Sequence, residues 1–185
     1  MAPEAGAPAV DIFATPWGWA AAAWSPRGVR SLILPRPERR EAEIAIEGRV
    51  GPGLRHRPRH DLRRQLREYL EGRRRVFSIP LDLEVTGNFT GRVLAWVKDV
   101  PYGSTVTYGE VAQAVGSPRG ARAVGGAMSR NPLPILIPCH RVVAADGPGG
   151  FSGGLPKSRL LELEEEQPAS SPGCRPAAGR EGRVR

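Results

Sequence analysis

The first half of the chain alternates short apolar runs with polar turns. Two apolar runs, at residues 17–24 and 29–34, flank the turn sequence Ser25-Pro26-Arg27-Gly28 and predict a β-hairpin. Residues 62–71 place four apolar side chains on one face of a helix, with Asp61 as its N-cap. These side chains are Leu62, Leu66, Tyr69 and Leu70.

Less regular patterns complete this half. Residues 37–46 combine helical character with interleaved charges and predict a helix. Residues 48–59 are rich in Gly, Pro and Arg and predict a loop, and residues 76–83 predict a strand bent at Pro80.

The second half is patterned for helices. Five apolar residues recur at helical spacing: Phe89, Val93, Trp96, Val97 and Val100. Thr107 is suited to cap a helix over residues 108–115, and another helix spans residues 119–130. Two short helices joined by a tight turn with Gly116 predict a helix-turn-helix, although many helical hairpins bind nothing. A buried strand at 135–137, a loop at 146–154 and a helix at 157–166 follow.

These elements predict an α/β protein with two domains. A small N-terminal α/β domain with an antiparallel sheet covers residues 11–85, and a mainly helical, winged-helix-like domain with the helix-turn-helix covers residues 86–167. Residues 1–10 are expected to be disordered. Residues 168–185 have almost no large apolar side chain and are expected to form a disordered tail.

Composition narrows the functional classes. The formal net charge of +8 favours a polyanionic partner such as nucleic acid, although a generically basic protein is an equal alternative on charge alone. The only cysteines are Cys139 and Cys174, which argues for a reducing compartment, and no Cys/His cluster has the spacing of a metal site. The sequence shows no signal peptide and no apolar run long enough to span a bilayer.

The most informative sequence is Ile-Pro-Cys-His-Arg-Val-Val at residues 137–143. A thiolate is the reactive form of cysteine, and a neighbouring imidazole such as His140 can take the proton of Cys139. A lone cysteine is by default a small buried apolar residue, but Pro138 and the adjacent histidine favour a reactive thiol. Because neighbouring residues on a strand point to opposite faces, Cys139 and His140 need a non-strand turn or a bridging water to communicate.

The surroundings of this motif carry a family resemblance. Tyr108, the run Arg122-Ala123-Val124-Gly125-Gly126-Ala127-Met128, the pair Asn131-Pro132 and the run at 151–155 accompany it. Together they resemble the methylated-DNA–protein-cysteine methyltransferases, which repair guanine alkylated on its 6-oxygen. The similarity is strong over residues 76–165 and weak before them.

The resemblance implies a function and its partners. It implies irreversible transfer of the alkyl group from 6-O-alkylguanine in double-stranded DNA to Cys139, so that each molecule acts once and needs no cofactor. We expect a monomer that does not bind membranes and acts in the cytoplasm, associated with the nucleoid in a bacterium, or in the nucleus of a eukaryote.

The resemblance also implies roles for individual residues. Cys139 is the nucleophile, His140 accepts its proton through water, and Asn131 braces the turn before the active site. The relay carboxylate is Glu164 if the pair Leu160-Leu161 fixes the register, and Glu165 if the alignment is ungapped. The implied contacts to DNA and to the flipped base are as follows: Tyr108 at the target phosphate, Arg122 inserted into the base stack, Arg119 and Met128 on the same DNA-binding surface, and Pro134, Val142, Phe151 and Ser152 in the base pocket.

Two features depart from the family or stay open. Phe151 replaces a tyrosine, which keeps a stacking surface and loses a hydroxyl. The basic segment at residues 48–75 is either a second phosphate-contacting surface or a solvated face.

Small residues in the helix at 119–130 indicate close approach to another backbone.

Two other function classes are compatible with parts of the sequence. One is a non-catalytic sensor of alkylation lesions, against which the presence of Cys139 argues. The other is a hydrolase with a Cys–His–Glu triad, which would turn over and would not need Tyr108 and Arg122.

Overall fold

The computed structural model describes residues 9–83, 88–147, 149–150 and 155–166. Three expectations concern residues outside these ranges: disorder of residues 1–8, the end of the predicted loop at 151–154, and the disordered tail at 168–185. Within them, no helix is both long and apolar enough to cross a membrane.

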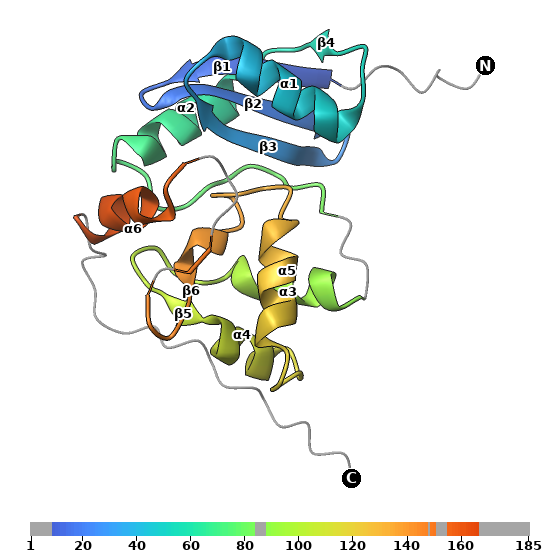
Figure 1. The fold of residues 1–185 in the computed structure, drawn as a ribbon. Coiled ribbons are helices and arrows are strands. Elements are labelled where there is room, and N and C mark those ends of the chain that lie inside the picture. Colours follow the sequence, from blue (N-terminus) through green and yellow to red (C-terminus); the bar gives the residue numbers. More distant parts are fainter. Residues whose placement is uncertain (1–8, 84–87, 148, 151–154, 167–185) are drawn as a thin grey trace.

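A four-stranded sheet forms the N-terminal half, in the order β3-β2-β1-β4 (Figure 1). Its strands are β1 (Ala9–Thr15), β2 (Gly18–Ser25), β3 (Gly28–Arg36) and the short β4 (Arg55–His56). The antiparallel pair β2 and β3 confirms the predicted hairpin. Strand β1 was not predicted, and the expectation of disorder up to residue 10 is wrong for Ala9 and Val10, because they pair with Trp24 and Ala23.

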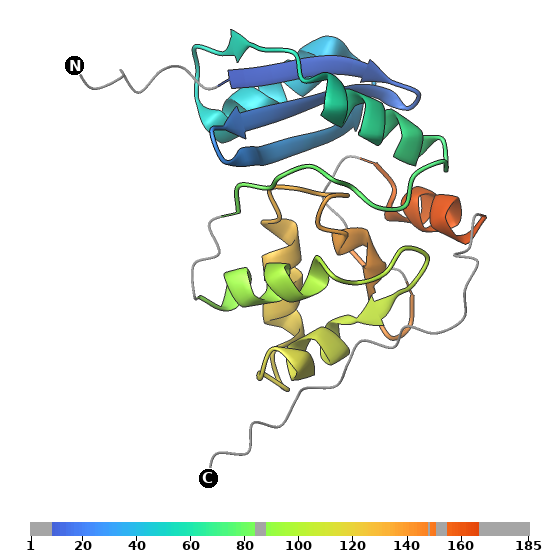
Figure 2. The same cartoon turned by 180° about the vertical axis from the view of Figure 1, so that it is seen from behind.

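Helices cover both faces of this sheet. The two helices are α1 (Arg39–Val50) and α2 (His60–Leu70), and the front and back views place them on opposite sides (Figures 1 and 2). The alanine run of β2 explains this sandwich, since Ala21 and Ala23 pack toward α1 whereas Ala20 and Ala22 pack toward α2. Small side chains let both helices approach the sheet closely.

The start of α2 differs from the prediction. Arg59, not Asp61, is the N-cap residue, and it makes no side-chain capping hydrogen bond. A carboxylate on β1 fixes this end instead, because Asp11 Oδ2 accepts the backbone N–H of Arg59 at 2.8 Å and Arg63 Nε at 2.7 Å. A long-range contact has replaced the local cap.

The predicted strand at residues 76–83 is wrong. The segment runs beside β3 between the two halves (Figure 2) and makes one isolated bridge, from Leu81 to Val29. Val29 N donates to Pro80 O at 2.9 Å, and Asp82 N donates to Val29 O at 2.8 Å. Pro80 has no N–H to extend a ladder, so the pairing stays limited to this bridge.

The C-terminal half is mainly helical. Its helices are α3 (Phe89–Val97), α4 (Tyr108–Ala114), α5 (Ala121–Ser129) and α6 (Lys157–Glu165), and strands β5 (Val106–Thr107) and β6 (Val142–Val143) form a small parallel sheet. Helices α4 and α5 are the predicted helix-turn-helix. Thr107 caps α4 as expected, in a capping box with Glu110.

One hydrophobic core joins the two halves. It includes Leu32 on β3, Tyr69 on α2, Val97 on α3, Ile137 before the active site and Leu160 on α6. The backbone also connects the halves, because Leu32 N donates to Pro132 O at 2.8 Å. The two predicted domains are therefore packed as one body in this structure.

Candidate active site

Cys139 and His140 lie in a one-turn 3₁₀ helix, η1 (Cys139–Arg141). This is the non-strand turn that communication between the two side chains requires. Cys139 is 5% exposed and His140 is fully buried. What remains exposed of Cys139 contributes to the wall of a cavity.

A strained turn delivers the chain to η1. The predicted strand at 135–137 is wrong, because Ile135 adopts φ 71°, a left-handed conformation that a β-branched residue rarely takes. Asn131 closes this turn from inside: its Oδ1 accepts Leu133 N, and its Nδ2 donates to Ile137 O, each at 2.9 Å. The side chain lies where a bracing role would require it.

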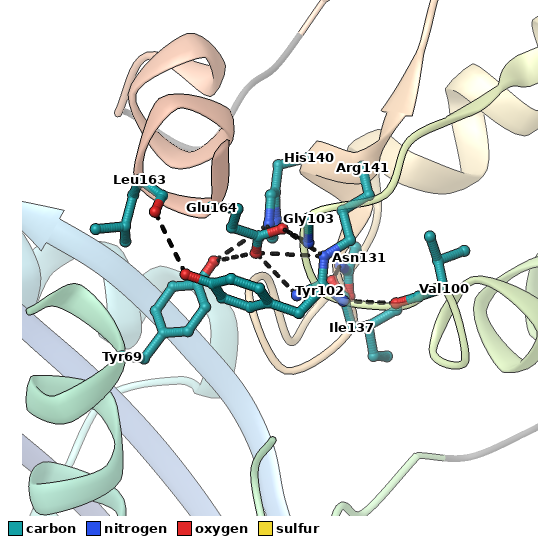
Figure 3. A network of polar contacts seen from close by, with 10 residues as sticks. All are labelled: Tyr69, Val100, Tyr102, Gly103, Asn131, Ile137, His140, Arg141, Leu163 and Glu164. Atoms are coloured by element: carbon teal, nitrogen blue, oxygen red, sulfur yellow. Dashed lines mark hydrogen bonds and ion pairs between the residues drawn. The ribbon is translucent and has the colours of Figure 1, made fainter. Parts of the chain in front are cut away.

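Glu164 is the carboxylate beside His140 (Figure 3). Its Oε1 lies 2.9 Å from His140 Nε2, and its side chain is almost completely buried. Arg141 Nε donates to Oε2 at 2.9 Å, and the backbone N–H of Gly103 donates to the same oxygen at 3.0 Å. Glu165 is exposed, so of the two registers the packing of α6 brings Glu164 to the histidine.

The second ring nitrogen of His140 is left available. Because Nε2 faces a carboxylate, we assign the proton of the neutral ring to Nε2. Nδ1 then carries a lone pair, and it is buried without a hydrogen-bond partner among the described residues. A buried acceptor of this kind is suited to receive a proton, directly or through a water molecule.

Burial and neighbouring charges shift the pKa values of all three groups. Burial raises the pKa of the Cys139 thiol, against a hydrogen bond from Asn131 and the charge of Lys157. Burial also lowers the pKa of His140, although Glu164 opposes this shift. Burial disfavours the charged form of Glu164, but hydrogen bonds from His140 and Arg141 outweigh it and hold its pKa well below the usual range. The resting site therefore contains a thiol, a neutral imidazole and a carboxylate.

A cavity of about 720 Å³ opens at Cys139. Among its walls are six residues that the sequence singled out: Tyr108, Arg122, Met128, Asn131, Pro134 and Cys139. Val142 is buried in β6 and is not among the lining residues, and Arg119 is exposed outside the cavity. Phe151 and Ser152 lie outside the described residues.

Sequence reasoning missed several residues at this site. Lys157 is buried, donates from Nζ to Val142 O at 2.5 Å and lies 5.6 Å from the centre of the Tyr108 ring. Arg49, from the end of α1, lines the cavity and donates to Asn131 O at 3.4 Å. Their only sequence signals were that Lys157 is one of two lysines and that Arg49 lies in the basic segment.

Much of the basic segment is engaged within the protein. Arg63 pairs with Asp11, and Arg74 and Arg64 both contact Glu68. Arg59 stacks 4.9 Å from the centre of the Trp24 ring. These contacts favour a structural use of the arginines over a second phosphate-contacting surface.

Known proteins share the sequence around this site. The family described as 6-O-methylguanine DNA methyltransferase, DNA binding domain, matches residues 88–166. A methylated-DNA–protein-cysteine methyltransferase of Methanopyrus kandleri is 42% identical over 130 residues, which cover 69% of this chain and 97% of that protein. One from Mycobacterium leprae is 50% identical over 109 residues, which cover 58% of this chain and 66% of that protein.

Solved structures of the same family have a similar fold. The crystal structure of Mycobacterium tuberculosis O6-methylguanine methyltransferase superposes with a TM-score of 0.72 at 31% identity, covering 89% of this chain and 96% of that one. The enzyme of Pyrococcus kodakaraensis gives a TM-score of 0.69 at 33% identity, covering 84% and 98%. The chain belongs to the methylated-DNA–protein-cysteine methyltransferase family.

Proposed function

We propose that this protein repairs DNA by moving the alkyl group of 6-O-alkylguanine onto Cys139. The observation that carries the proposal is a cavity lined by Cys139 beside a buried His140–Glu164 pair, in which His140 Nδ1 has no hydrogen-bond partner within the described part of the chain. A structure of the Mycobacterium tuberculosis relative in complex with DNA, similar over 86% of this chain, supports DNA as the partner.

The helix-turn-helix face suits a nucleic-acid backbone. Arg119 and Arg122 are exposed near the N-terminal end of α5, and Arg122 also lines the cavity. A side chain added at Gly125 would meet only ordinary contact with the Tyr108 ring, 3.9 Å away. Gly126 is also open to a side chain, so packing among the described residues does not require either glycine, which fits close approach by a partner.

The target base has to leave the duplex to reach the thiol. Enzymes that act on a base within DNA extrude the nucleotide into a pocket, at a cost of a few kcal/mol. Tyr108 and Arg122 both line the cavity. In this proposal Tyr108 contacts the rotated nucleotide and Arg122 fills the vacated stack. Met128 and Pro134 supply apolar walls for the base.

The reaction is a substitution at the alkyl carbon. The Cys139 proton passes through a water molecule to His140 Nδ1, and Glu164 stabilises the imidazolium that results. The thiolate forms a sulfur–carbon bond while the bond between that carbon and the guanine 6-oxygen breaks, and its electron pair leaves with the guanine. Tyr108, whose pKa is raised by burial and by Cys139, stays protonated and can donate to the departing guanine.

The thioether is not cleaved again in this scheme, so one molecule repairs one lesion without a cofactor. Such a protein belongs where the DNA is: in the cytoplasm at the nucleoid of a bacterium, or in the nucleus of a eukaryote.

Duplex DNA with a radiolabelled 6-O-methylguanine tests the proposal. We expect label on the wild-type protein up to one equivalent and none on Cys139→Ser, which should still bind DNA. A lesion sensor would leave the label on the DNA, and a hydrolase would release it catalytically. Label on Cys139→Ser would contradict the assignment of the acceptor.

A further inference from the structure

Tyr69 connects the N-terminal half to the His140–Glu164 pair. It lies on α2, has no exposed surface and donates its hydroxyl to Glu164 Oε1 at 2.6 Å. The Tyr69 hydroxyl oxygen is also 3.3 Å from His140 Nε2. Figure 3 shows the phenol reaching from α2 to the carboxylate, whereas His140, Arg141 and Glu164 all come from the C-terminal half.

The position of the phenol is fixed by aromatic packing. The Tyr69 ring lies 5.4 Å from Phe77 in a tilted arrangement and 6.1 Å from Tyr102 edge to face. Such contacts hold a ring in one orientation. A neutral phenol so close to a buried carboxylate stays protonated, since burial and Glu164 raise the pKa of Tyr69 well above its usual value. The hydroxyl is therefore a permanent donor.

Glu164 Oε1 is a crowded acceptor. It receives Tyr69 at 2.6 Å, Arg141 Nη2 at 2.8 Å and His140 Nε2 at 2.9 Å. An ionised carboxylate offers about two lone pairs on each oxygen, so three donors at Oε1 have to share them. The phenol thus competes directly with the imidazole for the oxygen that stabilises its protonated form.

We propose that Tyr69 is a positioning residue of the relay: its hydroxyl holds Glu164 Oε1 against His140 Nε2 and takes part of that oxygen's charge, so that the imidazole rests in the form able to accept the Cys139 proton. This inference rests on the proposed function, because it takes the roles of Cys139 and His140 from it. If Tyr69 has this role, the N-terminal half of the chain contributes a residue to the proton relay.

Several charged or titratable groups face this cluster and act on the same protonation. Glu164 and Lys157 approach from α6, Arg141 and Cys139 from η1, Tyr69 from α2, and Tyr102, with Arg75 stacked over its ring, from the other side of Glu164. Among these groups, all from the described ranges, only the Tyr69 hydroxyl is both close to Nε2 and removable without changing a formal charge. Its substitution by phenylalanine therefore tests the hydrogen bond without altering the charge of the site.

The test is the pH dependence of single-turnover methyl transfer at saturating duplex DNA. In the wild type the rate should fall at low pH as His140 becomes protonated and can no longer accept a proton. Tyr69→Phe removes one competing donor, which makes Oε1 a better acceptor for the imidazolium and raises the pKa of His140. We expect the acid limb of the profile to move upward by about one pH unit.

Tyr102→Phe is the matched control. It removes another buried phenolic hydroxyl, which donates to Leu163 O at 3.4 Å and does not touch His140. Its acid limb should stay where the wild type has it. A limb that does not move in Tyr69→Phe, or that moves downward, overturns the inference whatever happens to thermal stability.

A second variant keeps the inference testable if Tyr69→Phe does not fold. Placing 3-fluorotyrosine at position 69 strengthens the donor and should move the limb downward, and an unchanged limb overturns the inference. His140→Asn separates the two hypotheses. It should abolish the limb, and a limb that persists there contradicts the proposed relay itself, not only the role of Tyr69.

Discussion

At the scale of single residues, Glu164 has two tasks that a substitution separates. It neutralises the buried guanidinium of Arg141 and it contacts His140. Glu164→Gln keeps the shape and leaves Arg141 without its counter-charge, so we expect the free energy of unfolding to fall by about 3–5 kcal/mol. The thiol of Cys139 should also alkylate more slowly at neutral pH.

Glu165→Gln is the control for this change, because the side chain lies one residue further and is exposed. It should change the free energy of unfolding by about 0.5 kcal/mol or less. Urea titrations and thiol-alkylation rates on both variants decide the matter. Equal behaviour of the two variants would mean that neither carboxylate polarises His140.

Arg122 is predicted to matter for extrusion of the base more than for affinity. Arg122→Ala should slow transfer from duplex DNA more than transfer from free 6-O-methylguanine, because the free base has no stack to leave. Arg119→Ala, at the other exposed arginine near this end of α5, should instead weaken binding to all DNA and reduce its salt dependence by about one contact. An equal loss on duplex and free base would assign Arg122 to the pocket instead.

At the scale of elements, the turn before η1 depends on one amide. Asn131→Ala leaves Leu133 N and Ile137 O buried without these partners, so we expect a loss of about 2–4 kcal/mol in the free energy of unfolding. Asn88→Ala removes only an N-cap at α3, where Asn88 Oδ1 accepts Gly91 N at 2.8 Å, and should cost about 1 kcal/mol. Chemical denaturation of both variants measures the difference, and equal losses would deny the bracing role.

Elements with a strong local pattern could be predicted from the sequence. The apolar face of α2 and the Thr107–Glu110 box of α4 are encoded within a few residues. The strained turn at Ile135 could not be, because its side chain is typical of strands and the conformation is imposed by Asn131 and the core. Strand β1 is recognisable only through its pairing with β2.

The residues of the candidate site were likewise predictable only where the signal is local in the sequence. The adjacent pair Cys139-His140 is visible in the sequence, and a leucine pair placed Glu164 near it. Tyr69 was read only as one apolar position on a helical face. Its hydroxyl partner lies 95 positions away on α6, a distance that no local periodicity can report.

At the scale of the whole molecule, the free energy of unfolding should decrease as the pH is lowered from neutrality. Burial lowers the pKa of His140, so the unfolded chain takes up its proton first, below about pH 6.5. A second loss should begin near pH 4, because the pKa of Glu164 is also lowered on folding and its contribution disappears as the carboxylate is protonated.

The free energy of unfolding, measured by urea from pH 8 to about pH 2.5, checks this order. His140→Gln should remove the decline between about pH 6.5 and the onset of the second loss near pH 4, whereas His56→Gln, at an exposed histidine, should keep it. A wild-type stability that is flat in this interval would contradict the buried, neutral state of His140.

The hydrogen bond from Leu32 to Pro132 has a consequence for how such proteins can be recombined. A chimera that joins the sheet half of one relative to the acceptor half of another has mismatched surfaces at the contacts that position Asn131 and Tyr69. Gene fusions joined between residues 83 and 88 should therefore express as folded repair proteins only when the side chains around Leu32, Tyr69 and Leu160 come from the same parent. A functional exchange of halves would have to include the residues of both halves that pack against each other.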